Sequence, residues 1–386
     1  GQAAATLAVV SGYFTVFPGS TLTLPGIAGI ILGIGMGVDA NVITAERIKE
    51  ELSKNKTLEG AVNSGFKMGL TPIIDGNVTI VIVAAILMGA FGPTDGFWAK
   101  VFNPIFYWFG PSTAGTIYSF GFTLLTSVLL NFVFGVWATR VMIRGAVHFK
   151  PLRNAWLFGG KKEGGADFKT PSINFIGNRK KFYTFSCALI AVVLVFCGIF
   201  GVKMDVEFKG GSMITLAYEG DADLNDLKST IGAELGKSNL TLQTGSDISG
   251  NQTLTVTLPG SDTLTTEQLD NLLAALNEQY PDNKFVQNEV SNVDATIGKE
   301  FLLKSVVALV AACVLILLYV AYRFRKIGGL KAGSTAIVAL LHDMFVVFGV
   351  FVLLRIPLNG NFIAALLTIL GYSINDTVVI YDRIRE

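Results

Sequence analysis

The sequence predicts a polytopic α-helical membrane protein with an internal pseudo-symmetric repeat and one small α+β domain. Of its 386 residues, 51% are hydrophobic and only 15% are charged, which is too apolar for a soluble chain of this size. Its apolar runs are long and continuous and do not alternate with a period of two, so helices are expected and β-barrel strands are not. A motif that occurs near both ends of the chain indicates the repeat.

The apolar runs predict about eight membrane spans of roughly 20 residues each. They lie near residues 3–24, 25–45, 71–92, 118–142, 182–203, 302–323, 332–354 and 361–381. Lysine and arginine crowd the segments 46–67, 140–181, 323–331 and the C-terminal residues, whereas the segments 93–117 and 355–360 hold almost none. The positive-inside rule therefore places the basic segments in the cytoplasm. No cleavable signal peptide is visible, and because the chain opens partway into an apolar run, we expect a fragment of a longer protein.

A polar insert at residues 204–297 is expected to form a small ferredoxin-like domain outside the membrane. The pattern predicts strands at 212–218, 240–244, 253–258 and 284–290 and helices at 223–235 and 265–280, in the order β-α-β-β-α-β. We expect Thr265 or Thr266 to cap the second helix and a residue from Asp221 to Asp223 to cap the first. From Asp205 to Glu300 there are 16 acidic residues and 5 lysines. This acidity favours the extracytoplasmic side, and it serves either solubility or contact with a passing polypeptide.

The repeat pairs GMGVDANVITAERIKE, residues 35–50, with GYSINDTVVIYDRIRE, residues 371–386. Each copy places an acid, Asp39 or Asp376, about two turns inside a span. Such an acid costs about 2.5–3.5 kcal/mol on insertion scales, so it needs a reason to be there. A desolvated carboxyl that titrates near the working pH can relay protons across the membrane. The alternative is a permanently protonated or hydrogen-bonded acid that only holds helices together.

Other polar and small residues surround the two acids in the sequence. Supporting polar roles are assigned to the hydrogen-bonding groups Asn41, Asn375, Asp75, His342 and Asp343. Asp75 lies either at the opening of a proton path or simply in the membrane interface. His342 and Asp343 form either a proton relay or a core pair whose hydrogen bonds are satisfied. Close helix packing is expected at the small residues Gly35, Gly37, Gly371 and Ser373. At the cytoplasmic boundary, helix anchors are expected at Glu46, Arg47, Asp382 and Arg383.

The motifs for other energy sources and for enzymes are missing from the sequence. The glycine-rich stretch FKGGS lacks the spacing of a P-loop, so ATP is not the expected energy source. We see neither a metal-ligand cluster nor a nucleophile with its base, and Cys187, Cys197 and Cys313 read as small apolar residues of the spans. No enzyme, metal or bound cofactor is therefore expected. A proton gradient is the expected source of energy.

Several motifs resemble those of the SecD/SecF family, and the whole chain resembles a SecDF fusion. The stretch TLTLPGIAGIILGIGMGVDANVITAERIKEEL is similar to SecD, while VEFKGGSMITL, LLHDMFVVFG and GYSINDTVVIYDRIRE are similar to SecF. The resemblance implies a SecD-like membrane half at 1–142, a cytoplasmic linker at 143–181, a first SecF-like span at 182–203, the external domain at 204–297 and further SecF-like spans at 298–386. It also implies membership of the resistance-nodulation-division superfamily.

The family resemblance carries further expectations about function. It implies an accessory component of Sec protein export in the bacterial cytoplasmic membrane, which uses the proton motive force late in translocation. The implied partners are the Sec channel with its accessory membrane subunits, an unfolded preprotein at the extracytoplasmic side, and the lipid bilayer, but no nucleic acid. The family's two intramembrane aspartates fall on Asp39 and Asp376. The resemblance also implies that the family's first spans, larger external domain, last spans and essential arginine belong to parts of the protein outside these 386 residues. The alternatives are a proton-driven exporter of small molecules or lipids and a non-transporting scaffold.

Overall fold

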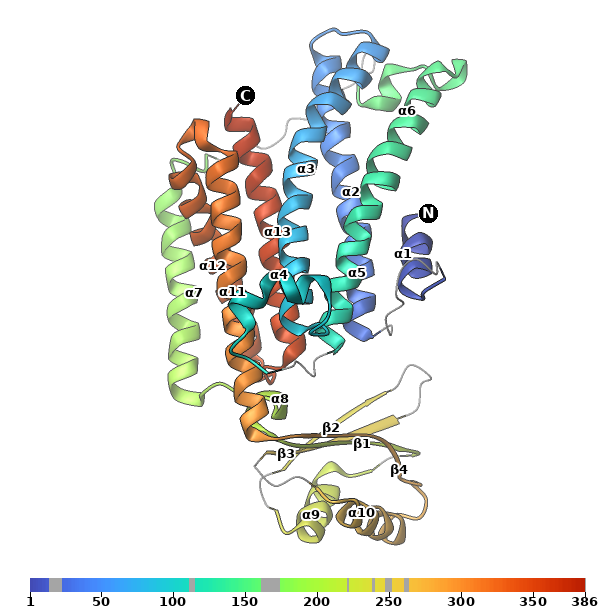
Figure 1. Cartoon of the computed structure of the whole chain (residues 1–386), viewed down its shortest axis with the longest axis vertical. Helices are drawn as coiled ribbons and strands as arrows, with labels where there is room; N and C mark the ends of the chain where they lie inside the picture. Colours follow the sequence, from blue (N-terminus) through green and yellow to red (C-terminus); the bar gives the residue numbers. More distant parts are fainter. Residues whose placement is uncertain are drawn as a thin grey trace. The chain divides into compact units, whose positions relative to one another are not determined.

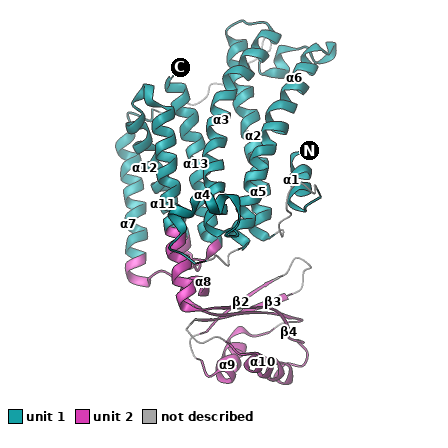
Figure 2. Cartoon of the chain, in the orientation of Figure 1, with its two compact units in different colours: residues 1–196, 307–350, 361–386 teal, residues 197–306, 351–360 magenta. Residues whose placement is uncertain are grey.

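The computed structural model describes the chain except for residues 14–22, 111–114, 161–173, 221, 238–239, 247–251, 260–263 and 386. The chain divides into two compact units, which Figure 2 shows in different colours. One unit comprises residues 1–196, 307–350 and 361–386, and the other comprises residues 197–306 and 351–360. Most of the long helices belong to the first unit, and the single described sheet belongs to the second.

Seven helical segments within the described residues are long and apolar enough to cross a membrane. They are α2 (Leu24–Ser53), α3 (Leu58–Phe91), the segment Gly115–His148, α7 (Arg179–Phe200), α11 (Ala295–Arg323), α12 (Gly329–Leu353) and α13 (Gly360–Arg385). The third segment contains α5 (Gly115–Asn131), a π-helical stretch (Phe132–Ala138) and α6 (Thr139–His148). These segments match seven of the expected spans in order. The expected span at 3–24 differs, because α1 (Gln2–Val10) has only 9 residues and residues 14–22 lie outside the described part.

Shorter helices connect the long ones. They are α4 (Phe97–Phe106), the 3-10 turns Lys150–Leu152, Ala155–Phe158 and Arg325–Ile327, and α8 (Val206–Lys209). Residues 161–173 of the expected linker at 143–181 lie outside the described residues. The part of it that is described continues α6 to His148 and begins α7 at Arg179.

A row of small residues lets α2 lie close to α5 (Figure 1). Gly26, Gly29 and Gly33 follow each other at helical spacing and face hydroxyl side chains of α5. A Cβ added at Gly33 would overlap Ser127, so the two backbones approach as closely as glycine permits. Gly35, which points elsewhere, has no atom of a neighbouring segment within 4 Å of an added Cβ. The close packing expected at Gly35 is therefore found at its neighbours on the α5 face instead.

The second unit contains a β-α-β-β-α-β arrangement, as the sequence pattern predicts. Its elements are β1 (Gly211–Tyr218), α9 (Leu224–Leu235), β2 (Thr241–Ser246), β3 (Gln252–Pro259), α10 (Thr266–Gln279) and β4 (Val286–Val293). The strands are ordered β2-β3-β1-β4 and every neighbouring pair is antiparallel, which is the topology of a split β-α-β unit. Figure 1 shows α9 and α10 on the same face of this sheet.

Alternation along the central strand explains the core of this unit. Ile214 and Leu216 of β1 are fully buried, and they pair with Val256 and Leu254 of β3 in the antiparallel register. Their side chains join one apolar cluster with residues of both helices. Thr265 closes a capping box at the start of α10, while Asp223 caps α9.

Candidate functional site

The acids of the two repeat motifs lie on α2 and α13, which a hydrogen bond connects. Asp39 is half-buried on α2, and Tyr372 of α13 donates its hydroxyl hydrogen bond to Oδ2 of Asp39. Tyr372 and Asp376 are four residues apart and lie on the same face of α13. The side chain of Asp376 is exposed among the described residues. Asp39 and Asp343 lie near enough to Asp376 for their charges to interact.

A second set of polar residues connects α12 to the same face of α13. Ser373 donates a hydrogen bond of 2.6 Å to Oδ2 of Asp343, and Nδ1 of His342 lies 3.2 Å from Oδ1 of the same carboxylate. Ser373 thus contributes a hydroxyl group as well as a small side chain. Nε2 of His342 is buried and has no hydrogen-bond partner within the described structure. The pair His342 and Asp343 therefore belongs to the polar cluster around the two repeat acids.

The asparagines next to the two acids do not bond to a carboxylate within the described residues. Asn375 is 9% exposed and packs against Gly76 of α3, where any added Cβ would overlap its amide. Its role in the structure is thus a close contact between α3 and α13. Gly371 takes part in the same contact at ordinary van der Waals distance, 3.4 Å from an added Cβ to Val83. Asn41 is half-buried on α2 and makes no hydrogen bond to a carboxylate in the described part of the chain.

Asp75 is covered by the protein and pairs with charged and polar groups of another helix. It is 4% exposed on α3, and its Oδ1 accepts hydrogen bonds from Nε of Arg323 at 2.7 Å and from the Tyr319 hydroxyl at 3.0 Å. Both donors come from α11, four residues apart on one face. The other carboxylate oxygen, Oδ2, is buried without a partner among the described residues. The arrangement is a second buried charge site that links the two halves of the first unit.

The basic ends of the two motif helices are joined by ion pairs. Arg47 and Asp382, 4% and 2% exposed, place a guanidinium nitrogen 3.7 Å from a carboxylate oxygen. In a second ion pair, Arg383 of the second motif supplies the cation and Glu50 of the first motif supplies the carboxylate. Glu46, in contrast, is 62% exposed and pairs only at the surface with Lys49 of its own helix. Arg47 and Asp382 thus form a buried contact between the two repeats at the basic ends of their helices.

Sequence reasoning missed three participants in these clusters: Tyr319, Arg323 and Tyr372. Each precedes or follows a polar partner by four residues on its own helix, and this spacing is the signal that could have identified them.

Gly37 lies at a close contact between segments, because an added Cβ would come within 2.6 Å of Gln2 and 3.2 Å of Asn131. No group of three or more histidine, cysteine or carboxylate side chains in the described regions could hold a metal ion.

The fold and these clusters define a polytopic membrane protein whose repeated acidic helices meet inside one helical unit. The chain matches the family "Protein export membrane protein SecD/SecF, C-terminal" over residues 3–99 and 273–386, and it belongs to that family. It is 30% identical over 380 residues to the protein translocase subunit SecDF of Bacillus subtilis, a match that covers 95% of this chain and 47% of that one. It is 36% identical over 219 residues to the subunit SecF of Alicyclobacillus acidocaldarius, which covers 56% of this chain and 68% of that one.

A solved structure shows the same fold. The crystal structure of SecDF from Thermus thermophilus, described as a translocon-associated membrane protein, matches with a TM-score of 0.74 and 30% identity. That match covers 100% of this chain and 46% of the other. The chain therefore spans about half the length of the SecDF relatives it matches.

Proposed function

We propose that this chain is the membrane portion of an accessory subunit of the Sec machinery and that the proton motive force drives it. Asp39 and Asp376 carry the protons in this proposal. The observation that supports it most is the hydrogen bond from Tyr372 to Asp39, because it couples the acid of one repeat to the helix that holds the acid of the other. The names of the relatives, protein translocase subunits, support the role in export.

A proton on Asp39 would change the force between α2 and α13. An ionised Asp39 accepts a hydrogen bond from the Tyr372 hydroxyl and repels the neighbouring acid Asp376. A neutral Asp39 weakens both the hydrogen bond and the repulsion. Each uptake and release of a proton therefore shifts the balance of attraction and repulsion between α2 and α13. Moving one charge across a potential of about 100 mV supplies about 2.3 kcal/mol for such a change.

The segment 204–297 acts outside the cytoplasm in this proposal. The charge distribution supports this orientation, since the basic segments 46–67, 140–181 and 323–331 would all be cytoplasmic. The proposed partners are the Sec channel with its accessory membrane subunits, and an unfolded preprotein that the external domain contacts. No bound cofactor takes part, because the proton gradient is the proposed energy source.

The test uses membrane vesicles that contain the protein in its full natural length, with the Sec channel and an imposed proton gradient. Release of a preprotein is compared for wild type, Asp39→Asn and Asp376→Asn at equal membrane abundance. Asp95→Asn is the matched control, because Asp95 is an exposed acid in the loop before α4. We expect both motif variants to lose gradient-dependent release and the control to retain it.

Two other outcomes would overturn the proposal. If release persists in both motif variants, the acids are structural and the protein is a scaffold for the channel. If the variants instead lose gradient-driven efflux of a small molecule or lipid while preprotein release continues, the protein is an exporter.

A further inference from the structure

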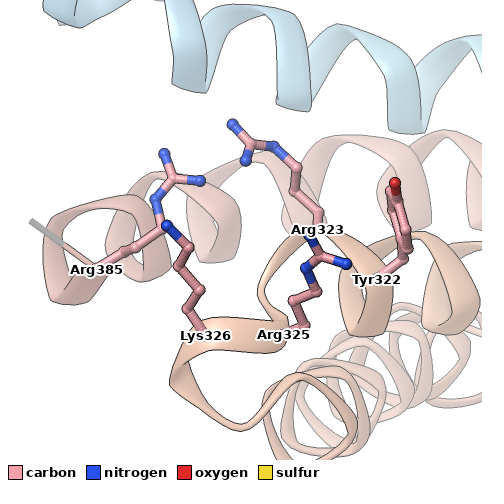
Figure 3. A pocket seen from close by; sticks show the side chains of 5 residues that line it. All are labelled: Tyr322, Arg323, Arg325, Lys326 and Arg385. Atoms are coloured by element: carbon pink, nitrogen blue, oxygen red, sulfur yellow. The ribbon is translucent and has the colours of Figure 1, made fainter.

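A basic pocket lies at the ends of α11 and α13, away from the repeat acids. Its volume is about 410 Å³, and it is lined by Tyr322, Arg323, Arg325, Lys326 and Arg385. Figure 3 shows that all five side chains rise from their helices toward the same side. Four of the five carry a positive charge, and none carries a negative charge.

Two of the guanidinium groups are held in place by buried carboxylates. Nε of Arg323 donates to buried Asp75, and Arg385 pairs with buried Asp382. Both guanidinium groups also lie over the ring of Phe324, at 5.9 Å and 5.8 Å from its centroid. Phe324 is fully buried, so this platform is rigid. Each arginine has more N–H donors than its carboxylate uses, and the remaining donors are already ordered for a ligand.

The other two cations are not neutralised within the described part of the protein. Arg325 and Lys326 are exposed, and no described carboxylate lies within 4.0 Å of either charge. Arg325 is instead positioned over the ring of Tyr322 at 5.6 Å. Tyr322 is 72% exposed at the basic end of a membrane span, where aromatic side chains mark the level of the lipid headgroups. The pocket thus combines ordered guanidinium donors with uncompensated positive charge at headgroup depth.

We propose that this pocket binds a phosphate group, either that of an anionic lipid headgroup or free phosphate. Arg323 and Arg385 provide the ordered donors, and Arg325 and Lys326 provide the excess charge. Arginine forks match the geometry of phosphate oxygens, and each further lysine or arginine strengthens the attraction to an anionic group. A bound phosphate would connect the end of α13, the helix of Asp376, to the end of α11. The proposal is independent of proton coupling.

The test measures binding to the purified chain by native mass spectrometry with three probes. They are phosphatidylglycerol, the net-neutral lipid phosphatidylcholine and inorganic phosphate as a competitor. The pocket variant is Arg325→Gln with Lys326→Gln, which leaves the two buried ion pairs intact. The control variant is Lys67→Gln with Lys180→Gln, because these exposed lysines remove the same charge from basic segments outside the pocket. Thermal unfolding without ligand checks that both variants fold.

We expect wild type and control to retain phosphatidylglycerol in preference to phosphatidylcholine, and the pocket variant, which lacks two of the charges, to bind it about 30-fold more weakly. If inorganic phosphate displaces the lipid, and if the pocket variant also binds phosphate more weakly than wild type does, the ligand is free phosphate. If phosphate does not displace the lipid, the ligand is the lipid headgroup. An equal loss in both variants, or no loss in either, would overturn the proposal. The cations would then only offset the negative ends of the two helices.

Discussion

Single residues in the repeat differ in importance according to their burial. Asp382 and Glu46 occupy equivalent positions in the two motifs, yet Asp382 is 2% exposed beside Arg47 and Glu46 is 62% exposed. We predict that Asp382→Asn lowers the free energy of unfolding by about 3 kcal/mol, because it removes the buried carboxylate charge that pairs with both Arg47 and Arg385. The matched change Glu46→Gln should cost less than about 0.5 kcal/mol. Chemical unfolding in mixed detergent micelles measures both, and similar losses would contradict the buried pair.

The second unit contains an acid whose environment predicts a dependence on pH. Glu207 accepts a hydrogen bond of 2.5 Å from the backbone N–H of Gly360, yet burial raises the pKa of its carboxyl above 4.5 and the charge of Asp205 adds to this effect. The folded state therefore holds this proton more tightly than the unfolded state. The resulting stability is fully present below the ordinary pKa and is lost as pH rises through the raised one.

We therefore predict that, measured relative to Glu207→Gln, the melting temperature of wild type falls as pH rises from about 4 to about 8. The glutamine side chain keeps an oxygen that can accept the hydrogen bond from the Gly360 N–H. A change in the pH dependence of melting therefore reports the lost titration of Glu207 and not the loss of this hydrogen bond. Part of the slope should remain, since burial also raises the pKa of Asp205. The exposed Glu289→Gln is the control and should melt with the wild-type slope. An unchanged slope in Glu207→Gln would show that this proton does not contribute.

At the scale of helices, the glycines of α2 separate into two faces. We predict that Gly33→Ala destabilises the first unit by about 1–3 kcal/mol, because the new methyl group overlaps Ser127 of α5. Gly35→Ala should be neutral or stabilise by up to about 1 kcal/mol, since nothing lies near its added Cβ and alanine favours the helix. Unfolding in detergent micelles compares the two. Equal effects would mean that α2 does not contact α5 through this face.

The sequence predicted these elements better than it predicted their contacts. Apolar length determines a membrane helix, so seven spans and all six elements around the sheet fell close to their expected places. Contacts depend on which face of a helix meets its neighbour, and a single motif does not reveal that face. Gly35 and Gly37 lie two residues apart, yet only Gly37 meets other segments. For the same reason the sequence did not reveal that Asp75 pairs with Arg323, which lies 248 residues away.

The whole molecule has a charge asymmetry that predicts its orientation in the membrane. The loop after α2 is basic, whereas the segment between α7 and α11 is acidic, so the positive-inside rule places them on opposite sides. We predict that Asp282→Cys, in an exposed turn of the second unit, reacts with a membrane-impermeant thiol reagent in intact cells. Lys54→Cys, in the exposed loop after α2, should react only after the membrane is opened.

Both variants need a background in which serine replaces Cys187, Cys197 and Cys313, since Cys187 is exposed and could react by itself. Three candidate spans lie between residues 54 and 282, so the two positions should lie on opposite sides of the membrane. Labelling of both positions from the same side would contradict this arrangement. Labelling in the reverse order would place the acidic unit in the cytoplasm, where it could not contact a preprotein that has already crossed. The orientation test therefore separates the export role from the proton chemistry. Asp39 and Asp376 could relay protons in either orientation of the protein. The acidic unit, in contrast, can act on an emerging preprotein only when it lies outside the cytoplasm.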